Sequence, residues 1–271
     1  MKRFVVVVSC LVFFLLAIAP QQSTLQAQDD TKKVKLRWFG QSMFQLETAG
    51  RKSVVFDPQA IPAFSPPRLI ADITLISHPH NDHNQVEILK EKGRVFEGVK
   101  AGKGTKSEWN AVDEKVGEIR VRSLGTFHDA MNGMQRGKNS IWIVEASGLT
   151  FVHLGDLGHT LSAEQVKAIG KVDVLMVPVG GIYTLNGEQA KKVVEQLKPR
   201  LFVLPMHYGV PGFDEILDAT EFLEDQKNLK KLPDTNELEI PVDLNPEAPT
   251  VVLLGWKAPV KIDPKKEPEK K

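Results

Sequence analysis

The segment His78–His83, with the sequence HPHNDH, constrains this chain more than any other feature. It places three imidazoles and one carboxylate within six residues, directly after the apolar run Ile73–Ile76. Neutral imidazole and carboxylate together suit zinc and other first-row metals. In the spacing H-x-H-x-D-H, the first two histidines can bind one ion, and the aspartate and the third histidine can bind a second. The pattern therefore predicts a metal site at a strand end; the alternative is a polar turn that happens to contain histidines.

Composition is that of an ordinary globular protein. The chain has 271 residues, of which 42% are hydrophobic and 25% are charged, which allows one large domain or two small ones. Its 35 Lys and Arg nearly balance its 34 Asp and Glu. Because there is no basic excess to neutralise phosphates, we expect no nucleic-acid partner and predict a small-molecule substrate instead.

The first 28 residues have the pattern of a secretory signal peptide. Two basic residues precede the apolar run Phe4–Ala19, and a polar stretch follows it. Since this run is shorter than the roughly 20 residues of a stable span, we expect no membrane span after its removal. The protein is then exported, to the periplasm or outside the cell; the alternative is an uncleaved N-terminal anchor. Cys10 is the sole cysteine, so the mature chain would form no disulfide and offer no thiolate ligand.

The remaining boundaries follow from composition. Residues 29–33 are expected to form a linker and residues 34–256 the hydrolase domain. Residues 257–271 contain six Lys and three Pro with few apolar residues, which predicts a disordered, solvated tail.

Strand-like and helix-like stretches are mixed along the domain. Residues 35–39 and 42–47 suggest a hairpin, and residues 140–145 and 149–154 suggest another around Ser147–Gly148. The runs 73–76, 172–179 and 201–204 are typical of buried strands. Helix starts are expected at Asn84 and Ser162, and an amphipathic helix over 186–197. This mixture predicts an α+β fold with helices packed on sheets.

Further ligand-type residues follow other predicted strands. His128 comes after the strand over 118–124, Asp156 after the strand over 149–154, and His207 after the strand over 201–204. Because strand ends at one edge of a sheet share a cleft, these residues can meet the histidine cluster there.

A dinuclear site needs about three protein ligands for each ion and an anion between them. We expect His78, His80 and His128 to bind the first ion. Asp82, His83 and His207 would then bind the second ion, and Asp156 is the bridging carboxylate.

Several other residues have two interpretations each. Asp57 and Asp129 either receive the second N–H of a metal-bound histidine or form ordinary turns. His159 is either a proton carrier near the metals or a structural residue, and Tyr183 either contacts substrate or packs. His153 lies inside a predicted strand, where a packing role is expected.

These motifs resemble the metallo-β-lactamase superfamily. The residues that carry the resemblance are the H-x-H-x-D-H segment, the three later ligands, and the stretches 136–139, 153–159, 172–181 and 205–208. The resemblance is closest to a branch of metal-dependent hydrolases that includes the ascorbate-6-phosphate lactonase. It implies a four-layer αββα sandwich with the metals at one edge. Members with a Cys ligand have no counterpart here, because Asp156 stands in that place, which argues against β-lactam hydrolysis.

The expected function is a hydrolase with two divalent metal ions, zinc before manganese or iron. A metal-bridged hydroxide would attack a small ester, lactone or amide, and Asp82 would orient or accept a proton. One alternative is a phosphodiesterase of the same fold, for which Arg136 and Lys138 are the candidate cations. Another is an exported metal-binding protein with little catalysis. The substrate and the oligomeric state stay open.

Overall fold

The computed structural model describes residues 32–102 and 106–258. Its helices are the 3₁₀ turn η1 (Val86–Ile88), α2 (Ala163–Ile169), α3 (Gly187–Leu197) and α4 (Thr220–Leu223). Its strands are β1 (Lys33–Trp38), β2 (Phe44–Glu47), β3 (Ser53–Phe56), β4 (Ile73–Ile76), β5 (Arg94–Glu97), β6 (Val99–Ala101), β7 (Ser107–Trp109), β8 (Asp113–Val116), β9 (Ile119–Phe127), β10 (Lys138–Ala146), β11 (Leu149–His153), β12 (Val174–Pro178), β13 (Phe202–Met206), β14 (Leu229–Leu232), β15 (Glu237–Pro241) and β16 (Thr250–Leu254).

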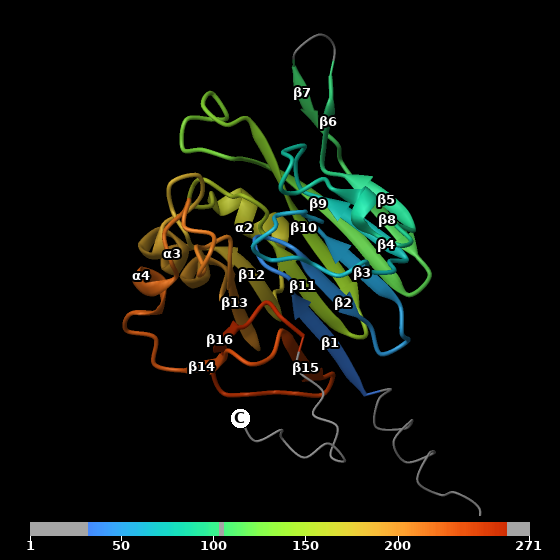
Figure 1. The fold of residues 1–271 in the computed structure, drawn as a ribbon, viewed down its shortest axis with the longest axis vertical. Coiled ribbons are helices and arrows are strands. Elements are labelled where there is room, and N and C mark those ends of the chain that lie inside the picture. Colours follow the sequence, from blue (N-terminus) through green and yellow to red (C-terminus); the bar gives the residue numbers. More distant parts are fainter. Residues whose placement is uncertain (1–31, 103–105, 259–271) are drawn as a thin grey trace, which may run out of the picture.

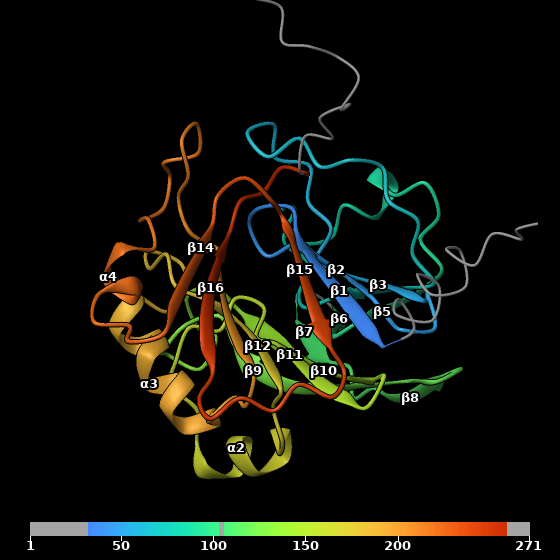
Figure 2. The ribbon, with the colours of Figure 1, turned by 90° about the horizontal axis from the view of Figure 1, so that it is seen from below.

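Two sheets face each other (Figures 1 and 2). In the described ranges, the first sheet has the order β15-β1-β2-β3-β4-β5 and the second the order β14-β16-β13-β12-β11-β10-β9-β8. The expected hairpins are present, because β1 pairs antiparallel with β2 and β10 pairs antiparallel with β11. A small ribbon of β6 and β7 projects from one end (Figure 1). The sandwich that the family resemblance predicts is confirmed.

The main core lies between the sheets. On β3, Val54 and Phe56 join this core, whereas Val55 points to the opposite face of the first sheet. This alternation follows from the two-residue period of a strand. In contrast, all five residues of β12 are buried, because neighbouring strands flank it and both of its faces are covered.

The helices α2, α3 and α4 lie on the outer face of the second sheet (Figure 2). Both α2 and α3 begin with a capping box, formed by Ser162 with Gln165 and by Asn186 with Gln189. In each box the first side chain accepts the N–H of the residue three positions later, which satisfies an unpaired donor of the first turn. The expected helix starts at these two positions are therefore confirmed.

The outer face of the first sheet is covered differently. Leu89 and Ala71 pack there on Val55, and the segment around Leu89 contains only the η1 turn. The expected helix with Asn84 as its N-cap is therefore wrong: the side chain of Asn84 donates to Pro79 O, and Leu89 is already extended. Leu89 is buried beside Val55, so this extended segment covers part of the first sheet in place of a helix.

The strands that precede the candidate ligands end at one edge. β3 and β4 are parallel, as are β11, β12 and β13. β9 points the same way as β11, because each is antiparallel to β10. The segments that follow these strands therefore converge at a common edge of the sandwich.

The predicted signal peptide (residues 1–28) and most of the predicted tail (257–271) lie outside the described residues. Within the described ranges, the helices are all too short or too polar to cross a bilayer.

Candidate metal centre

The structure brings the seven expected ligands together in two groups at this edge. Each group offers ligand atoms that all lie within 4.8 Å of one another. The first group comes from the ends of β4 and β9, and the second from the ends of β4, β11 and β13. The members are His78, His80 and His128 in the first group, and Asp82, His83, Asp156 and His207 in the second.

One oxygen atom lies at the centre of both groups. Asp156 Oδ2 is 3.1 Å from the Nε2 atoms of His83, His128 and His207, and 3.8 Å from that of His78. A single carboxylate oxygen has about two lone pairs, so it cannot accept a hydrogen bond from every one of these imidazoles. The arrangement is typical of a carboxylate that lies between two cations.

Hydrogen bonds determine which nitrogen of each histidine faces the centre. Asp57 is fully buried, and its carboxylate accepts from Ser77 N (2.7 Å), Ser77 Oγ (2.6 Å) and His83 Nδ1 (3.0 Å). Since the Ser77 hydroxyl donates to Asp57, His78 Nδ1 must donate to Ser77 Oγ, at 2.9 Å. His83 and His78 therefore both present an unprotonated Nε2 when neutral, as metal-bound histidines do.

His128 is oriented from another loop. Its Nδ1 donates to Tyr183 O at 3.1 Å, which leaves Nε2 toward Asp156. His80 is the exposed member of its group, and its Nδ1 lies 3.0 Å from His78 Nε2. Because His78 donates from Nδ1, its Nε2 carries a lone pair when the ring is neutral. His80 Nδ1 therefore either donates a proton to this lone pair, or both nitrogens face a common cation.

Electrostatics reinforce the arrangement. Burial would raise the pKa of Asp156, but electrostatic interaction with the imidazoles of His207 and His83 outweighs it and holds that pKa well below the ordinary value. Burial would lower the pKa of His83, but Asp156, Asp57 and Asp82 raise it well above 6.5. Burial lowers the pKa of His78. Without metal the centre is thus an ionised Asp156 beside a protonated His83.

The residues with two interpretations have distinct positions. Asp57 contacts His83, as described above, but Asp129 contacts no ligand: its carboxylate accepts four backbone N–H groups of its own loop. His159 lies outside both groups, and its ring accepts from Phe127 N and donates to Thr160 O. His153 is buried, stacks on Phe56 at 5.1 Å and donates to Ser42 O, which is a packing role.

Close backbone contacts need glycine at two positions. A Cβ on Gly158 would lie 2.4 Å from Asp129 N and 2.5 Å from His128 O. A Cβ on Gly180 would lie 2.3 Å from His207 O. Only a residue without a side chain allows these approaches, so both glycines help to place a ligand-bearing loop.

Three buried polar residues at the centre were missed from the sequence. Gln41, in the turn between β1 and β2, donates from Nε2 to Asp82 Oδ2 at 2.8 Å. Ser42 Oγ lies 3.4 Å from Asp156 Oδ1, and Asn139 Oδ1 accepts from Asp156 N at 3.0 Å. Gln41 and Ser42 lie in the turn between β1 and β2 and Asn139 lies on β10, and no local spacing connects these residues to the ligands.

A cavity of about 520 Å³ opens onto both groups. Gln135, Arg136, Tyr183 and Glu215 line it together with His80, Asp82, His128, Asp156 and His207. Tyr183 is 44% exposed, so its ring is accessible beside the ligands. We call this space the metal cavity.

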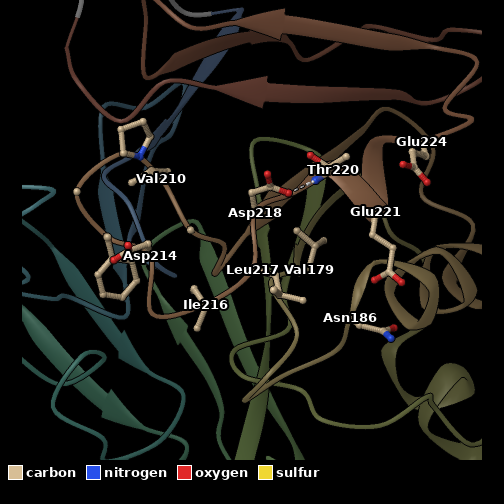
Figure 3. A pocket seen from close by; sticks show the side chains of 14 residues that line it. Val179, Asn186, Val210, Asp214, Ile216, Leu217, Asp218, Thr220, Glu221 and Glu224 are labelled. Atoms are coloured by element: carbon tan, nitrogen blue, oxygen red, sulfur yellow. Dashed lines mark hydrogen bonds between the residues drawn. The ribbon is translucent and has the colours of Figure 1, made fainter.

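A larger cavity of about 920 Å³ lies beside the segment 209–218 (Figure 3) and contains no member of either group. Two of its acidic side chains accept hydrogen bonds from backbone N–H groups. Asp218 accepts from Thr220 N at 2.9 Å, and Glu221 accepts from Gly187 N at 2.7 Å at the start of α3. These carboxylates cap backbone donors at the beginnings of α4 and α3.

The donor set fits divalent metal ions. His83 Nε2 is buried without a hydrogen-bond partner, although it lies close to two carboxylates: 3.1 Å from Asp156 Oδ2 and 3.3 Å from Asp82 Oδ2. These contacts are short but not aligned for hydrogen bonds. A buried nitrogen of this kind is costly unless it has a partner, and a cation between these atoms would provide one.

Comparisons with known proteins find a family model and relatives that are named metal-dependent hydrolases. The family model described as "Beta-lactamase superfamily domain" matches residues 35–207. A metal-dependent hydrolase of Saccharolobus solfataricus is 30% identical over 218 residues, which cover 72% of this chain and 92% of the relative. Another from Thermococcus onnurineus is 30% identical over 193 residues, 65% of this chain and 85% of the relative.

A solved structure with a similar fold belongs to the same superfamily. A metallo-β-lactamase superfamily protein from Thermotoga maritima is 31% identical and has a TM-score of 0.64, over 82% of this chain and 98% of that one. None of these three relatives is named as a lactonase, so the closer likeness to the ascorbate-6-phosphate lactonase stays a prediction. The chain belongs to the metallo-β-lactamase superfamily and, like the relatives that it spans almost completely, is a metal-dependent hydrolase.

Proposed function

We propose that this protein binds two divalent metal ions, zinc before manganese or iron, and hydrolyses a small ester, lactone or amide. The observation that supports this best is the position of Asp156 Oδ2, close to imidazoles of both groups. One ion would be held by His78, His80 and His128, and the other by Asp82, His83 and His207, with Asp156 between them. Bound ions of this kind supply an activated water and polarise the bond to be cleaved.

Asp82 is the residue proposed to move a proton. Its side chain is 36% exposed and lines the metal cavity, whereas that of Asp156 is 2% exposed. Although burial opposes it, the close contact with His83 lowers the pKa of Asp82 below its ordinary value. Asp82 is therefore ionised at neutral pH and able to accept a proton, while the bond from Gln41 Nε2 holds one of its oxygens in place.

The test begins with metal content, since a failed substrate screen alone would decide little. The purified protein, its Asp156→Ala variant and an Asp214→Ala control are loaded with zinc, desalted and measured by elemental analysis. Asp214 is an exposed carboxylate of the larger cavity. We expect about two ions in the parent and in the control, and fewer in Asp156→Ala. One ion or none in the parent would refute the dinuclear proposal.

The reaction is then tested with lactones, carboxylic esters, amides and phosphodiesters. We expect the parent to hydrolyse carboxyl substrates, and Asp82→Asn to lose most of this rate while it keeps at least one ion. The phosphodiesterase alternative has lost part of its support, because Lys138 Nζ donates to Ser107 O and lies over the Trp109 ring, away from the metal cavity. Turnover of phosphodiesters alone would reverse the assignment, and full metal content without any turnover would favour the metal-binding protein.

Export is also proposed, from the signal-like pattern of residues 1–28. The full chain with a C-terminal tag is expressed in a Gram-negative host, and the periplasmic fraction is analysed by N-terminal sequencing. We expect a mature chain that begins near residue 29. A full-length chain in the membrane fraction would support the uncleaved anchor instead.

A further inference from the structure

One cation lines the metal cavity among the residues that the structure describes. Arg136 borders this space together with Gln135, Tyr183 and the exposed ligand His80. No Lys lines it in the described ranges. The metal cavity is therefore open to substrate on a side where a guanidinium group is available.

The loop that places Arg136 is built around one carboxylate. Asp129 accepts the backbone N–H groups of Met131, Gly133, Gln135 and Arg136, the last at 2.7 Å. These four hydrogen bonds to one carboxylate fix the loop and hence the position of Arg136.

The guanidinium group is held in place without being neutralised. Its Nη2 donates to Ile182 O at 3.0 Å, and its central carbon lies 5.3 Å from the centre of the Tyr183 ring. Its Nη1 has a long contact of 3.5 Å with Gln135 Oε1. Among the described residues, no carboxylate forms an ion pair with Arg136, so at least three of its five N–H donors stay available.

The partner of this arginine has a strained backbone. Ile182 has φ +54°, which is a rare conformation for a β-branched residue. Such strain persists only where the surroundings hold it, and it is found mostly at functional sites. The strained turn directs Ile182 O to Arg136, and the next carbonyl, Tyr183 O, to His128. One segment therefore positions both the arginine and a candidate ligand.

We propose that Arg136 forms an anion subsite, so that the substrate carries a carboxylate or phosphate group at a distance from the bond that is cleaved. Arg is suited to this role because its planar fork binds such groups through two parallel hydrogen bonds. Glu215 also lines the cavity, but it is exposed and forms no ion pair with Arg136. This inference rests on the proposed hydrolase function and narrows its substrate to anionic compounds.

The test measures binding, so that it does not depend on turnover. The zinc-loaded protein is titrated by calorimetry with succinate, glutarate and adipate, and with butyrate, which has one carboxylate. 3-Phosphonopropionate replaces the distal carboxylate by a phosphonate. Arg136→Gln removes the proposed contact. Lys138→Gln is the matched control, because it removes a positive charge two residues away without altering the cavity.

We expect at least one dianion to bind the parent and Lys138→Gln roughly tenfold or more tightly than butyrate, as for a charge-assisted pair. Arg136→Gln should bind dianions and butyrate about equally. Its zinc content should match the parent, which shows that His128 is undisturbed. A preference for the phosphonate over the dicarboxylates would identify phosphate as the natural group.

Equal binding of dianions and butyrate to the parent, at every chain length, would overturn the inference. A dianion preference that persists in Arg136→Gln would overturn it as well. Failure of the hydrolase proposal has a different signature: no turnover of any ester, with the binding difference intact.

Discussion

Replacing Asp57 should lower both the free energy of unfolding and the affinity for metal, whereas replacing a similar aspartate far from the metal groups should lower only the first. Asp57→Ala removes the acceptor of three buried donors, of which Ser77 N and His83 Nδ1 have no other acceptor among the described residues. A buried donor without a partner costs about 1–3 kcal/mol, so the two fixed donors cost about 2–6 kcal/mol in free energy of unfolding. Because Asp57 has φ +42°, alanine adds about 1–2 kcal/mol of backbone strain.

The effect on metal follows from His83. Without the bond to Asp57, its ring is free to rotate, and loss of such a bond typically lowers metal affinity by about 10–100-fold. Asp57→Asn is a milder change, because asparagine adopts positive φ more readily and keeps one acceptor oxygen. It should lose less stability while its metal affinity still falls, so it serves if the alanine variant does not fold.

Asp173→Ala is the matched control. Asp173 is as buried as Asp57 and accepts from Thr150 N at 2.9 Å and Arg200 Nε at 2.7 Å, but it lies outside both metal groups. Urea unfolding of metal-free protein gives the stability, and competition with a chromogenic chelator gives the zinc affinity. Both alanine variants should be less stable, and only the Asp57 variants should bind zinc more weakly. Unchanged zinc affinity in both Asp57 variants would refute the reasoning.

Three further outcomes are expected. Gly158→Ala should lower zinc content by elemental analysis, because its Cβ would meet His128 O at 2.5 Å; Gly117→Ala, with open space around it, should not. The pKa of Asp173 lies below 3.8 in the folded protein, since its hydrogen bonds and ion pairs outweigh burial. Ionised Asp173 therefore stabilises the folded protein above pH 3.8, and this contribution is lost as the pH falls through the pKa of Asp173 in the folded state. Between pH 7 and pH 3, Asp173→Asn should thus lose less free energy of unfolding than the parent, which urea unfolding measures. Zinc binding at pH 7 should release protons, because His83 is protonated without metal; calorimetry in buffers of different ionisation enthalpy checks this, and a buffer-independent heat would contradict it.

Much of this arrangement was predictable because each signal was local. The segment 78–83 holds four ligand-type residues, and His128, Asp156 and His207 each follow a strand with a clear pattern. Parallel strands end at one edge, so the convergence follows once the strands are recognised.

The rest depends on contacts that no local pattern reveals. Gln41 meets Asp82 across 41 residues of chain, because the turn between β1 and β2 lies at the same edge as the end of β4. Short charged strands such as β8 (DEKV) and β14 (LKKL) have compositions typical of loops, and only their pairing makes them strands. The residues from Asn84 have a helix-start pattern, but the structure has only the η1 turn there, and Leu89 packs on the first sheet in an extended conformation.

The centre also connects the two sheets. His78 and His83 follow a strand of the first sheet, and His128, Asp156 and His207 follow strands of the second, so contacts around Asp156 Oδ2 join the halves of the sandwich. His207 itself has φ +50°, and its backbone N–H donates to Gln41 O at 3.0 Å, a contact that crosses between the sheets.

Backbone strain of about 1–3 kcal/mol at such a residue persists only where the surroundings hold it. A ligand that binds only the folded state at 100 times its Kd adds about 2.7 kcal/mol of stability. Metal bound at this junction would therefore offset strain of this size, because the ions would hold together the two sheets that the strained residues join.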